Sequence, residues 1–544
     1  MLKISTPATM HESLLWVLAL VIIILMVVML GEKINISYPI FLVIAGLAIS
    51  FIPGLPSIEI KSELIFLIFL PPLLYEAAWN TSWKDFWRWR RIISIFAFGL
   101  VILTSGIVAV VSNAMIPDFT LSLGFLLGGI ISPPDAVAAT SVLRGIKVPK
   151  RVIAILEGES LVNDASSLIV FRFALAAVIS GTFVFHVAAL NFVFVTIMGI
   201  VIGVLIAMII YAIHRWLPTN ANIDTALTLV APYLMYLGAE QFHVSGVMAV
   251  VSGGLFISYR SHKIFSHTTR LQSTSMWTTV SFILNGFVFL LIGLELTNIV
   301  NGLTDYSLGE ALGYALIISL VIIITRVGFT LISSAFTVWV SRYITTADSR
   351  PGWRGPLIVG WAGMRGVVSL ASALSIPMLL ENGQAFPQRN LILFITFVVI
   401  LVTLVIQGLT LPLVIRLVNY EDPDHQRPEL EQESEIKAKL SRLALQALDL
   451  KHKTVFENNQ LVRDLRAQIT KILEVKEQIL SHQNNSRQPN VREYINVYID
   501  LIELQRNELH RLRNDPSYDH EVIRNLEAQM DLEEEKLKLQ VKNH

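Results

Sequence analysis

The sequence predicts an all-α, polytopic membrane protein with thirteen transmembrane helices and a helical cytoplasmic tail. Of its 544 residues, 53% are hydrophobic and only 15% are charged, whereas soluble domains average about 25% charged residues. Apolar runs of about 20 residues, enough to cross ~30 Å of hydrocarbon, recur throughout residues 13–419. The charge is instead concentrated in residues 420–544, which hold 19 Lys/Arg and 24 Asp/Glu. We therefore expect a membrane domain over 1–419 and a separate tail over 420–544.

The thirteen expected spans can be tested against the distribution of basic residues. If the N-terminus lies outside, the loops on the cytoplasmic side carry 17 Lys/Arg and those on the opposite side carry 3, as the positive-inside rule requires. The first span lacks a small-residue cleavage site, so we expect it to be retained. The spans lie near 13–30, 38–54, 63–80, 92–114, 120–143, 152–180, 187–213, 223–241, 244–260, 275–298, 308–340, 355–380 and 389–417.

Composition also limits the function. The chain has no cysteine, which excludes disulfides, thiolate metal sites and cysteine nucleophiles. The net charge is zero, so nothing suggests a nucleic-acid partner. The histidines form no metal-binding constellation, and we expect neither a cofactor nor an enzyme.

Charged residues inside the spans are the strongest functional signal, because a charge at the centre of a membrane helix costs ~2.5–3.5 kcal/mol on insertion scales. The alternative for three of them, Glu76, Glu157 and Glu295, is a position at a span end with the charge reaching water. The full set is Glu76, Asp135, Glu157, Glu159, Asp164, Arg172, Glu295, Arg326 and Arg365.

Two spans are expected to be broken. Residues 128–135 read Gly-Gly-Ile-Ile-Ser-Pro-Pro-Asp, and consecutive prolines remove two backbone donors and clash with the preceding turn. Residues 360–366 read Gly-Trp-Ala-Gly-Met-Arg-Gly, although small residues also serve close helix packing. The fifth and twelfth spans are seven apart, which gives them opposite orientations. This arrangement fits an inverted repeat, in which paired interrupted helices mark a transporter's binding site.

The sixth span carries three acids that helical spacing separates. At 100° per residue, Asp164, Ser160 and Glu157 lie within about 60° of one another, whereas Glu159 lies about 140° from Asp164. We therefore expect Asp164 and Ser160 to face one cavity, with Glu157 at its entrance. Glu159 should face elsewhere and need its own cation.

These residues suit exchange of a monovalent cation for a proton. A single buried carboxylate binds either H⁺ or the cation, and the oxygens of Asp164, Ser160 and the broken fifth span fit a hard cation. Because Asn163 cannot titrate, one acid predicts electroneutral, one-for-one exchange. The alternatives are a passive cation channel and, with no supporting constellation, a membrane enzyme.

Several motifs in residues 13–419 resemble the Na⁺/H⁺ exchanger branch of the monovalent cation:proton antiporters. Residues 158–164, Gly-Glu-Ser-Leu-Val-Asn-Asp, resemble the family's Gly-Glu-Ser-Leu-Leu-Asn-Asp signature. Residues 134–138, Pro-Asp-Ala-Val-Ala, and 363–366, Gly-Met-Arg-Gly, resemble two further family motifs, and 70–74 and 325–328 also match. The motifs occur in the family's order.

The resemblance implies the antiporter fold, with two crossed, broken helices, in an elevator-type homodimer of the cell (inner) membrane. Spans 4–6 and 11–13 would form a mobile core, and spans 1–3 and 8–10 a dimer domain. The transported ions would be H⁺ and Na⁺, or K⁺ or Li⁺, with a role in pH homeostasis. The implied cation- and proton-binding residues, Asp164 above all, are Asp164, Asn163, Ser160, Asp135, Pro134 and Ser132.

The resemblance also assigns supporting residues. Glu159 would form a structural ion pair with Arg326, and Arg365 would lie near Asp135 on the other broken helix. Two positions depart from the family pattern, because relatives often have Thr where this chain has Pro134 and a non-charged residue where it has Glu157. Cation selectivity therefore does not follow from the resemblance.

The tail reads as two long helices, over 429–480 and 490–542, with a break at residues 484–490. Apolar residues recur between its charges, as expected for an amphipathic helix. Two interpretations stay open: a solvated regulatory or spacer segment, and a helical hairpin that contributes to dimerisation.

Overall fold

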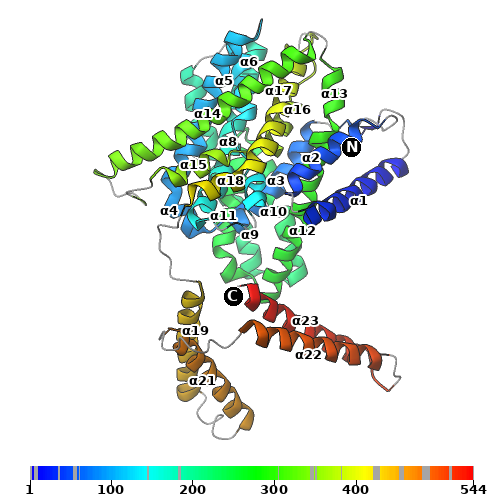
Figure 1. Ribbon diagram of the computed structural model, residues 1–544, viewed down its shortest axis with the longest axis vertical. Helices are drawn as coiled ribbons and strands as arrows, with labels where there is room; N and C mark the ends of the chain where they lie inside the picture. The colour runs from blue at the N-terminus through cyan, green and yellow to red at the C-terminus, as the bar shows by residue number, and fades with distance from the viewer. Residues whose placement is uncertain are drawn as a thin grey trace. The chain divides into compact units, whose positions relative to one another are not determined.

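The computed structural model describes most of the chain and divides it into two compact units, Met1–Glu421 and Asp422–His544. Within the described residues the chain is almost entirely helical (Figure 1), which confirms the predicted all-α class. The described residues are 3–4, 10–34, 37–52, 58–59, 62–143, 146, 148–181, 185–303, 306–343, 348, 352–380, 383–420, 429–451, 459–480, 491–513 and 517–542.

Helices cover each of the expected spans in the first unit. One short antiparallel pair connects β1 (Lys3–Ile4), which precedes the first helix, with β2 (Ile58–Glu59), which lies between the second and third helices. The helices are α1 (Met10–Ile34), α2 (Tyr38–Ser50), α3 (Ser62–Asn80), α4 (Trp83–Ser94), α5 (Val101–Met115), α6 (Leu121–Ile131), α7 (Ala136–Leu143), α8 (Lys150–Ser180), α9 (Phe185–Trp216), α10 (Ala221–Gln241), α11 (Gly246–Ile264), α12 (His267–Leu294), α13 (Leu296–Asn301), α14 (Leu308–Val340), α15 (Arg354–Trp361), α16 (Val367–Leu374), α17 (Arg389–Val402) and α18 (Gly408–Val418).

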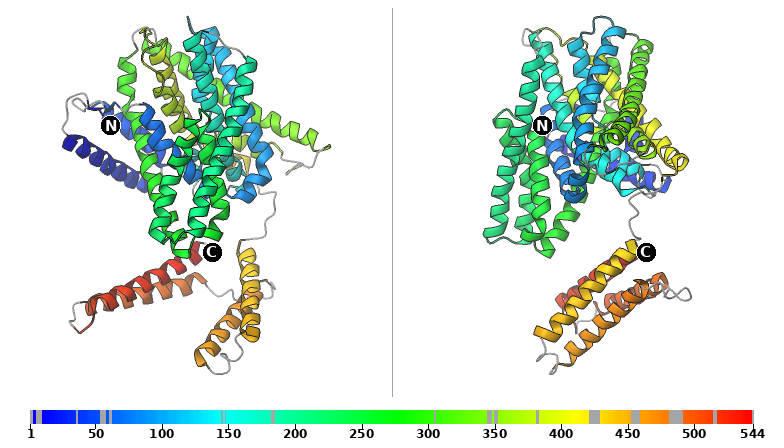
Figure 2. Two further views of the ribbon diagram at one scale, coloured as in Figure 1. Left: turned by 180° about the vertical axis from the view of Figure 1, so that it is seen from behind. Right: turned by 90° about the vertical axis from the view of Figure 1, so that its left-hand side faces the viewer.

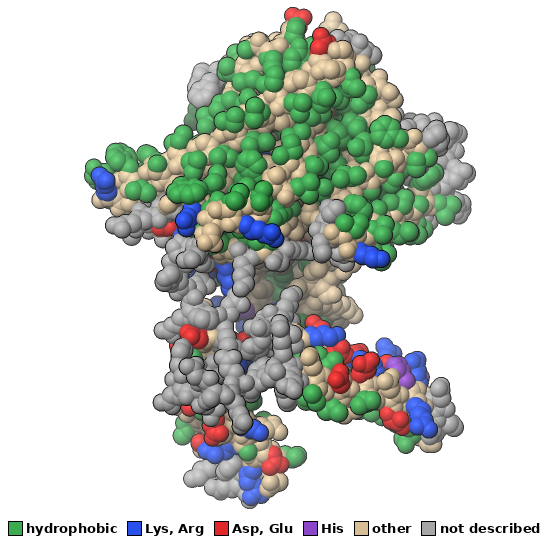
Figure 3. Space-filling view, in the orientation of Figure 1, with side chains coloured by type: hydrophobic (Ala, Val, Ile, Leu, Met, Phe, Trp, Pro, Cys, Tyr) green, Lys and Arg blue, Asp and Glu red, His purple; other side chains and the backbone are tan. Residues whose placement is uncertain are grey.

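Seven of the described helical segments are long and apolar enough to cross a membrane by length and composition. They begin at Trp83, Leu121, Lys150, Ala188, His267, Leu308 and Arg389. Hydrophobic side chains cover the face of this unit shown in Figure 3, and Lys and Arg side chains gather along one border of that surface. The chain is therefore a multi-pass membrane protein.

The helices of the first unit pack in two groups, most of whose contacts are internal. In one group α5, α6 and α8 pack together, and α14 packs against α15 and α17. In the other, α2 packs against α12, and α11 packs against α3, α9 and α10. Figure 1 shows α5 and α6 side by side and α14 running obliquely across the unit, and Figure 2 shows the green helices α9–α12 alongside one another. The groups meet where α16 contacts α3 and α12, and where α8 contacts α3 and α11.

Two helical segments are interrupted in the middle. Between α6 and α7 the backbone is non-helical over 132–135, at the two prolines, and between α15 and α16 it is non-helical over 362–366, at the glycine-containing stretch. Two other segments continue through π-helical turns: η1 (Ile95–Leu100) joins α4 to α5, and η2 (Thr403–Gln407) joins α17 to α18.

Three boundaries differ from the expected spans by six or more residues. The fourth helical segment begins at Trp83 rather than near 92, because a charged, amphipathic helix (α4) precedes its apolar part. The tenth begins at His267 rather than near 275, where Ser266 caps α12 by accepting the Thr269 N–H at 3.1 Å. The twelfth ends at Leu374 rather than near 380, and a β-bridge between Leu379 and Ala385 follows.

The expectation of two long tail helices is wrong. The tail holds four described helices that form two hairpins: α19 (Glu429–Lys451) with α21 (Gln460–Leu480), and α22 (Val491–Leu512) with α23 (His520–Lys542). Caps explain the new starts, because Asn459 accepts the Leu461 N–H at 2.9 Å and Asp519 accepts the Glu521 N–H at 2.7 Å. The spacing of apolar residues typical of a helix continues in the sequence beyond Lys451 and beyond Leu512, so it did not indicate that α19 and α22 end there. The expected break at 484–490 lies outside the described residues.

Candidate functional site

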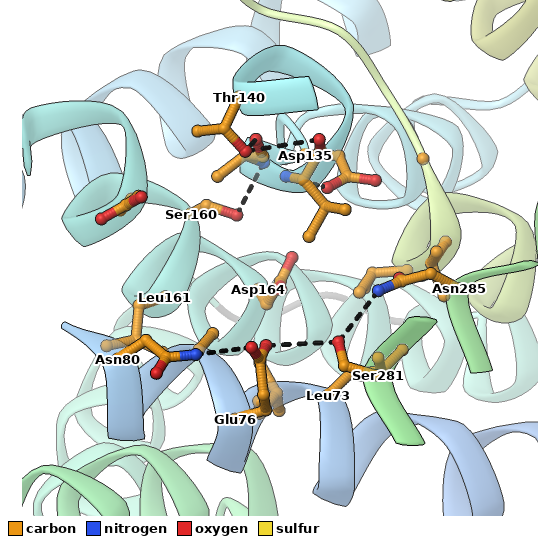
Figure 4. Close-up of a pocket in the computed structure, with 18 of the residues that line it drawn as sticks. Leu73, Glu76, Asn80, Asp135, Thr140, Ser160, Leu161, Asp164, Ser281 and Asn285 are labelled. Carbon is orange, nitrogen blue, oxygen red and sulfur yellow. Dashed lines mark hydrogen bonds between the residues drawn. The ribbon is translucent and has the colours of Figure 1, made fainter. Parts of the chain in front are cut away.

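A cavity lies where the two helix groups meet. Its volume is about 490 Å³, which is large enough for a hydrated monovalent cation. One wall carries Asp135, which directly precedes α7, together with Ser160 and Asp164 of α8. The other wall carries Glu76 of α3 and Ser281 of α12. Figure 4 shows Asp164 between these two sets of oxygens. The cavity is therefore bordered by residues of both groups.

Asp164 is the most central acid of this cavity. Its residue is 8% exposed and lies in the middle of α8, surrounded by buried residues along most of the helix. The Asp135 side chain lines the same cavity. Two acids facing one low-dielectric cavity create a local negative potential that favours a cation.

Ser160 and Asp135 support the start of α7. The Ser160 hydroxyl accepts the Ala136 N–H at 3.2 Å, and Oδ1 of Asp135 accepts the Val137 N–H at 2.8 Å. Oδ2 of Asp135 is buried and has no hydrogen-bond partner in the described part of the chain. The first N–H groups of a helix lack intrahelical partners, and a carboxylate there is stabilised by the helix dipole. Asp135 thus caps the start of the half-helix α7 and also lines the cavity.

The two interruptions are bonded to each other. The Asp135 N–H donates to the Met364 carbonyl at 2.7 Å, and the Arg365 guanidinium donates from Nη1 to the Ser132 carbonyl at 2.7 Å. A cation at the C-terminal end of α6 and an anion at the N-terminal end of α7 both complement the helix dipoles. The broken backbone is therefore buried in protein and bonded, as membrane depth requires.

Ser132, one of the expected cation ligands, makes its hydrogen bonds outside the cavity. Ser132 does not line the cavity, because its carbonyl is directed to Arg365 and its hydroxyl to the Gly129 carbonyl at 3.3 Å. Pro134 does line the cavity, together with Pro133. Within this break, Pro133 and Pro134 are thus the residues beside the cavity. A role of Ser132 as a cation ligand stays a prediction.

Asn163 also lies away from the cavity wall. It is fully buried on α8, and neither atom of its side-chain amide has a hydrogen-bond partner among the described residues. Asn163 is thus not among the residues that line the cavity, and its expected part in ion binding stays a prediction. Its amide carries no charge and cannot titrate, so Asp164 is the only acid of this Asn-Asp pair.

Glu159 faces Arg326 on α14, away from the cavity. Two guanidinium nitrogens donate to the two carboxylate oxygens at 2.6 and 2.8 Å, and both side chains are 1% exposed. Nη2 of Arg326 also donates to the Val359 carbonyl at 3.3 Å. A Cβ added at Gly363 would lie 2.2 Å from Cδ of Arg326. The glycine of the second interruption therefore leaves room for the buried arginine.

Glu157 lines the cavity on the same side of α8 as Asp164, with Glu76 as its charged neighbour. Glu76 accepts hydrogen bonds from Asn80 Nδ2 at 2.5 Å and from the Ser281 hydroxyl at 3.3 Å. Sequence reasoning treated both acids as equally compatible with span ends and missed the role of Ser281. A serine inside an apolar span was the only available signal for it.

Arg172 is not a buried charge of the site. It donates from Nη2 to Glu240 at 2.7 Å, and the two side chains are 48% and 29% exposed. The pair joins α8 to the end of α10, outside the cavity. A charge within an apolar stretch can thus lie at the helix surface when its partner comes from a neighbouring helix end.

An all-helical membrane protein, with two interrupted helices bonded to each other beside an acidic cavity, has the architecture of a secondary transporter. A family model described as the transmembrane part of sodium/hydrogen exchangers matches residues 17–417. The chain belongs to the sodium/hydrogen exchanger family. It is therefore a transporter of the cation:proton antiport class and not an enzyme.

Relatives and solved structures agree with this assignment. The chain is 35% identical over 411 residues to the sodium, potassium, lithium and rubidium/H⁺ antiporter of Bacillus subtilis, covering 72% of this chain but only 60% of that protein. It is 31% identical over 536 residues to an uncharacterised Na⁺/H⁺ exchanger of Mycobacterium bovis, with 96% of each chain covered. The fold is similar to that of the sodium proton antiporter MjNhaP1 from Methanocaldococcus jannaschii, with a TM-score of 0.60, 19% identity, and coverage of 76% of this chain and 100% of that one.

Proposed function

We propose that this protein exchanges a monovalent cation, Na⁺ and also K⁺ or Li⁺, for H⁺, with Asp164 as the carboxylate that binds either ion. The observation that carries the proposal is the position of Asp164, buried in the middle of α8 on the wall of a cavity beside the bonded interruptions. Relatives support the choice of ions, since one is named for antiport of sodium, potassium, lithium and rubidium.

One-for-one, electroneutral exchange follows if only Asp164 changes partners. Asp135 holds the start of α7 through its carboxylate, and Glu76 is hydrogen-bonded to Asn80 and Ser281 in the opposite helix group. Asn163 carries no charge. A proton or a singly charged cation then neutralises Asp164 equally well, and a carrier that moves only when neutralised transfers no net charge.

Alternating access is proposed to be of the elevator type. The cavity lies between the group that contains α5, α6, α8 and α14–α18 and the group that contains α1–α3 and α10–α12. Movement of the first group past the second would carry Asp164 from one side of the membrane to the other, leaving Glu76 in place. We propose that the second group forms a homodimer.

The proposed topology has thirteen spans in the cell (inner) membrane, with the N-terminus outside and the tail in the cytoplasm. It rests on the 17-to-3 distribution of basic residues over the two sides. In this orientation Glu157 lies at the cytoplasmic entrance of the cavity. The exchange would serve pH homeostasis, with protons and monovalent cations as the transported partners.

The test is cation-driven proton movement in proteoliposomes that hold a pH-sensitive dye. Asp164→Asn should abolish exchange while the protein still inserts, and Arg342→Gln, at an exposed residue far from the cavity, should leave it unchanged. Exchange retained in Asp164→Asn would exclude the proposal. A current in planar bilayers without counterflow of protons would instead support the channel alternative, and a current that accompanies exchange would exclude electroneutrality.

A further inference from the structure

An ion pair crosses between the two helix groups of the membrane unit. Nη2 of Arg172 on α8, in the first group, donates to Oε1 of Glu240 on α10, in the second group, at 2.7 Å. The Arg172 side chain is 48% exposed and that of Glu240 is 29% exposed. Neither residue lines the ion cavity, and the proposed binding of ions at Asp164 does not use them.

The face of α8 that leads up to Arg172 is apolar. At 100° per residue, four residues of α8 lie within about 60° of one another, and they are Leu161, Ala165, Leu168 and Arg172. The first three are buried in a cluster with apolar residues of α3, α10 and α11. Apolar contacts are non-directional, so they fix no particular position of α8 along the second group. Arg172 therefore adds a directed contact at the end of a face that can otherwise slide.

The ion pair and the cavity lie on opposite sides of Asp164. The residues of α8 that line the cavity are Glu157, Ser160, Leu161 and Asp164, so the cavity extends from Asp164 toward the start of the helix. Arg172 lies eight residues beyond Asp164 in the other direction, which is about 12 Å of helix at 1.5 Å per residue. The ion pair thus joins the two groups on the side of Asp164 away from the cavity.

The end of α10 makes this pair specific to one position of the first group. Glu240 is followed by Gln241, where α10 ends. The proposed elevator motion moves α8 away from the side on which the cavity now opens, and this carries Arg172 beyond the end of α10. The side chains that follow there are Gln241, Phe242 and His243, none of which is an acid. The pair is therefore formed in the present state and broken in the opposite one.

We propose that Arg172 and Glu240 form a latch that holds the two groups together in the state whose cavity opens toward the start of α8. The latch rests on the elevator motion proposed above, and it sets the equilibrium between the two states without binding the transported ions. An exposed ion pair is a weak contact, so its loss should change the ratio of the two states by about twofold to fivefold. A latch of this strength biases the equilibrium and still permits transport.

The experiment measures the ratio of the two states by double electron–electron resonance on the full-length protein in nanodiscs, diluted with unlabelled protein. The chain has no cysteine of its own, and spin labels at Leu417→Cys on α18 and Leu271→Cys on α12 occupy exposed positions, one in each group. Arg172→Gln, Glu240→Gln and the double variant should all reduce the present state by the same factor, because either single change already removes the whole pair. The exchanged pair, Arg172→Glu with Glu240→Arg, should restore the ratio of the wild type.

The matched control is Arg215→Gln on α9. This exposed arginine donates from Nη1 to the Lys263 carbonyl at 3.4 Å, a contact between two helices of the second group, so its loss should leave the ratio unchanged. Cation-driven proton exchange should persist in Arg172→Gln. Because a less populated state binds with lower apparent affinity, the KM for Na⁺ should rise at the face onto which the cavity opens and fall at the opposite face.

The contrary results separate the latch from the proposed function. Two label spacings with a ratio unchanged by Arg172→Gln and Glu240→Gln would overturn the latch alone, even if both variants melt at a lower temperature. Failure of the exchanged pair to restore the ratio, or an equal change in Arg215→Gln, would also overturn it. A single label spacing in wild-type protein that carries out exchange would contradict the elevator motion and the latch with it.

Discussion

A Cβ at position 366 would lie 1.8 Å from Oδ2 of Asp135. Gly366 begins the second half of one interrupted helix and Asp135 begins the second half of the other. No atom separates the two at the crossing. The absence of a side chain at Gly366 is thus what allows the Asp135 carboxylate to reach both the start of α7 and the cavity.

Gly366→Ala should therefore displace Asp135 and impair both stability and exchange. Overpacking of this kind typically costs about 1–3 kcal/mol, and we expect a lower melting temperature together with loss of most cation-driven proton flux. The measurement is thermal unfolding of the purified protein beside the dye assay in proteoliposomes.

The matched control is Gly313→Ala on α14, where an added Cβ meets nothing within 4 Å. It should leave the flux intact and not lower the melting temperature. If both alanine variants have the same melting temperature and proton flux, the close approach of Gly366 to Asp135 is not required for stability or exchange.

The sequence located the two interruptions but not the direction of every side chain and carbonyl around them. Consecutive prolines and a glycine-containing stretch are local signals, so the breaks at 132–135 and 362–366 could be located without tertiary information. Helical spacing likewise separated Glu159 from Asp164. Ser132 and Asn163 could not be placed in this way, because the direction of a carbonyl after a broken helix, or of an amide one residue from the site, depends on the packing of other helices. The pairing of Arg172 with Glu240 depends on a neighbouring helix for the same reason.

Arg326→Met should destabilise the protein more than the double replacement Glu159→Gln with Arg326→Met. Removal of one partner leaves a buried, uncompensated carboxylate and costs about 3–5 kcal/mol, whereas replacement of both partners by neutral residues is often far less costly. The measurement is the melting temperature of the three proteins under one detergent condition. Equal losses for the single and double variants would show that the ion pair contributes through its packing and not through its charge.

A second buried pair, which sequence reasoning missed, joins the ends of three helices. Asp224 in the first turn of α10 contacts Nδ1 of His214 on α9 at 2.8 Å and accepts the Thr269 hydroxyl of α12 at 3.2 Å. Asp224→Ala leaves Nδ1 of the buried His214 without this partner, which should cost about 1–3 kcal/mol, whereas the Thr269 hydroxyl keeps its contact of 2.9 Å with the Ser266 hydroxyl. We expect a clear fall in melting temperature.

The comparison for this pair is Gln272→Ala, which removes an exposed hydrogen bond of 2.9 Å to Asn222 between the same helices. Exposed substitutions of this kind usually stay within about 0.5 kcal/mol. A melting temperature for Asp224→Ala no lower than that for Gln272→Ala would mean that the three helix ends are held by apolar packing alone.

The second tail hairpin should lose stability on acidification. Arg506 donates to Glu534 at 2.6 Å and to Asp531 at 2.7 Å, and Nζ of Lys538 lies 2.5 Å from Glu534. The hydrogen bonds from Lys538 and then Arg506 lower the pKa of Glu534 below its ordinary value of 4.5. The folded hairpin thus binds fewer protons than the unfolded chain in this range, so the contribution of Glu534 to stability is present above pH 4.5 and is lost as the pH falls through the lowered value.

Hydrogen exchange of α22 and α23, corrected for intrinsic rates, should increase on acidification from pH 6 to pH 3.5, and Glu534→Gln should reduce that increase. Glu508→Gln, whose only ion pair in the described residues is an exposed contact of 3.9 Å with Arg511, should behave like the wild type. If it reduces the increase as much as Glu534→Gln does, the acid sensitivity belongs to the hairpin's overall charge.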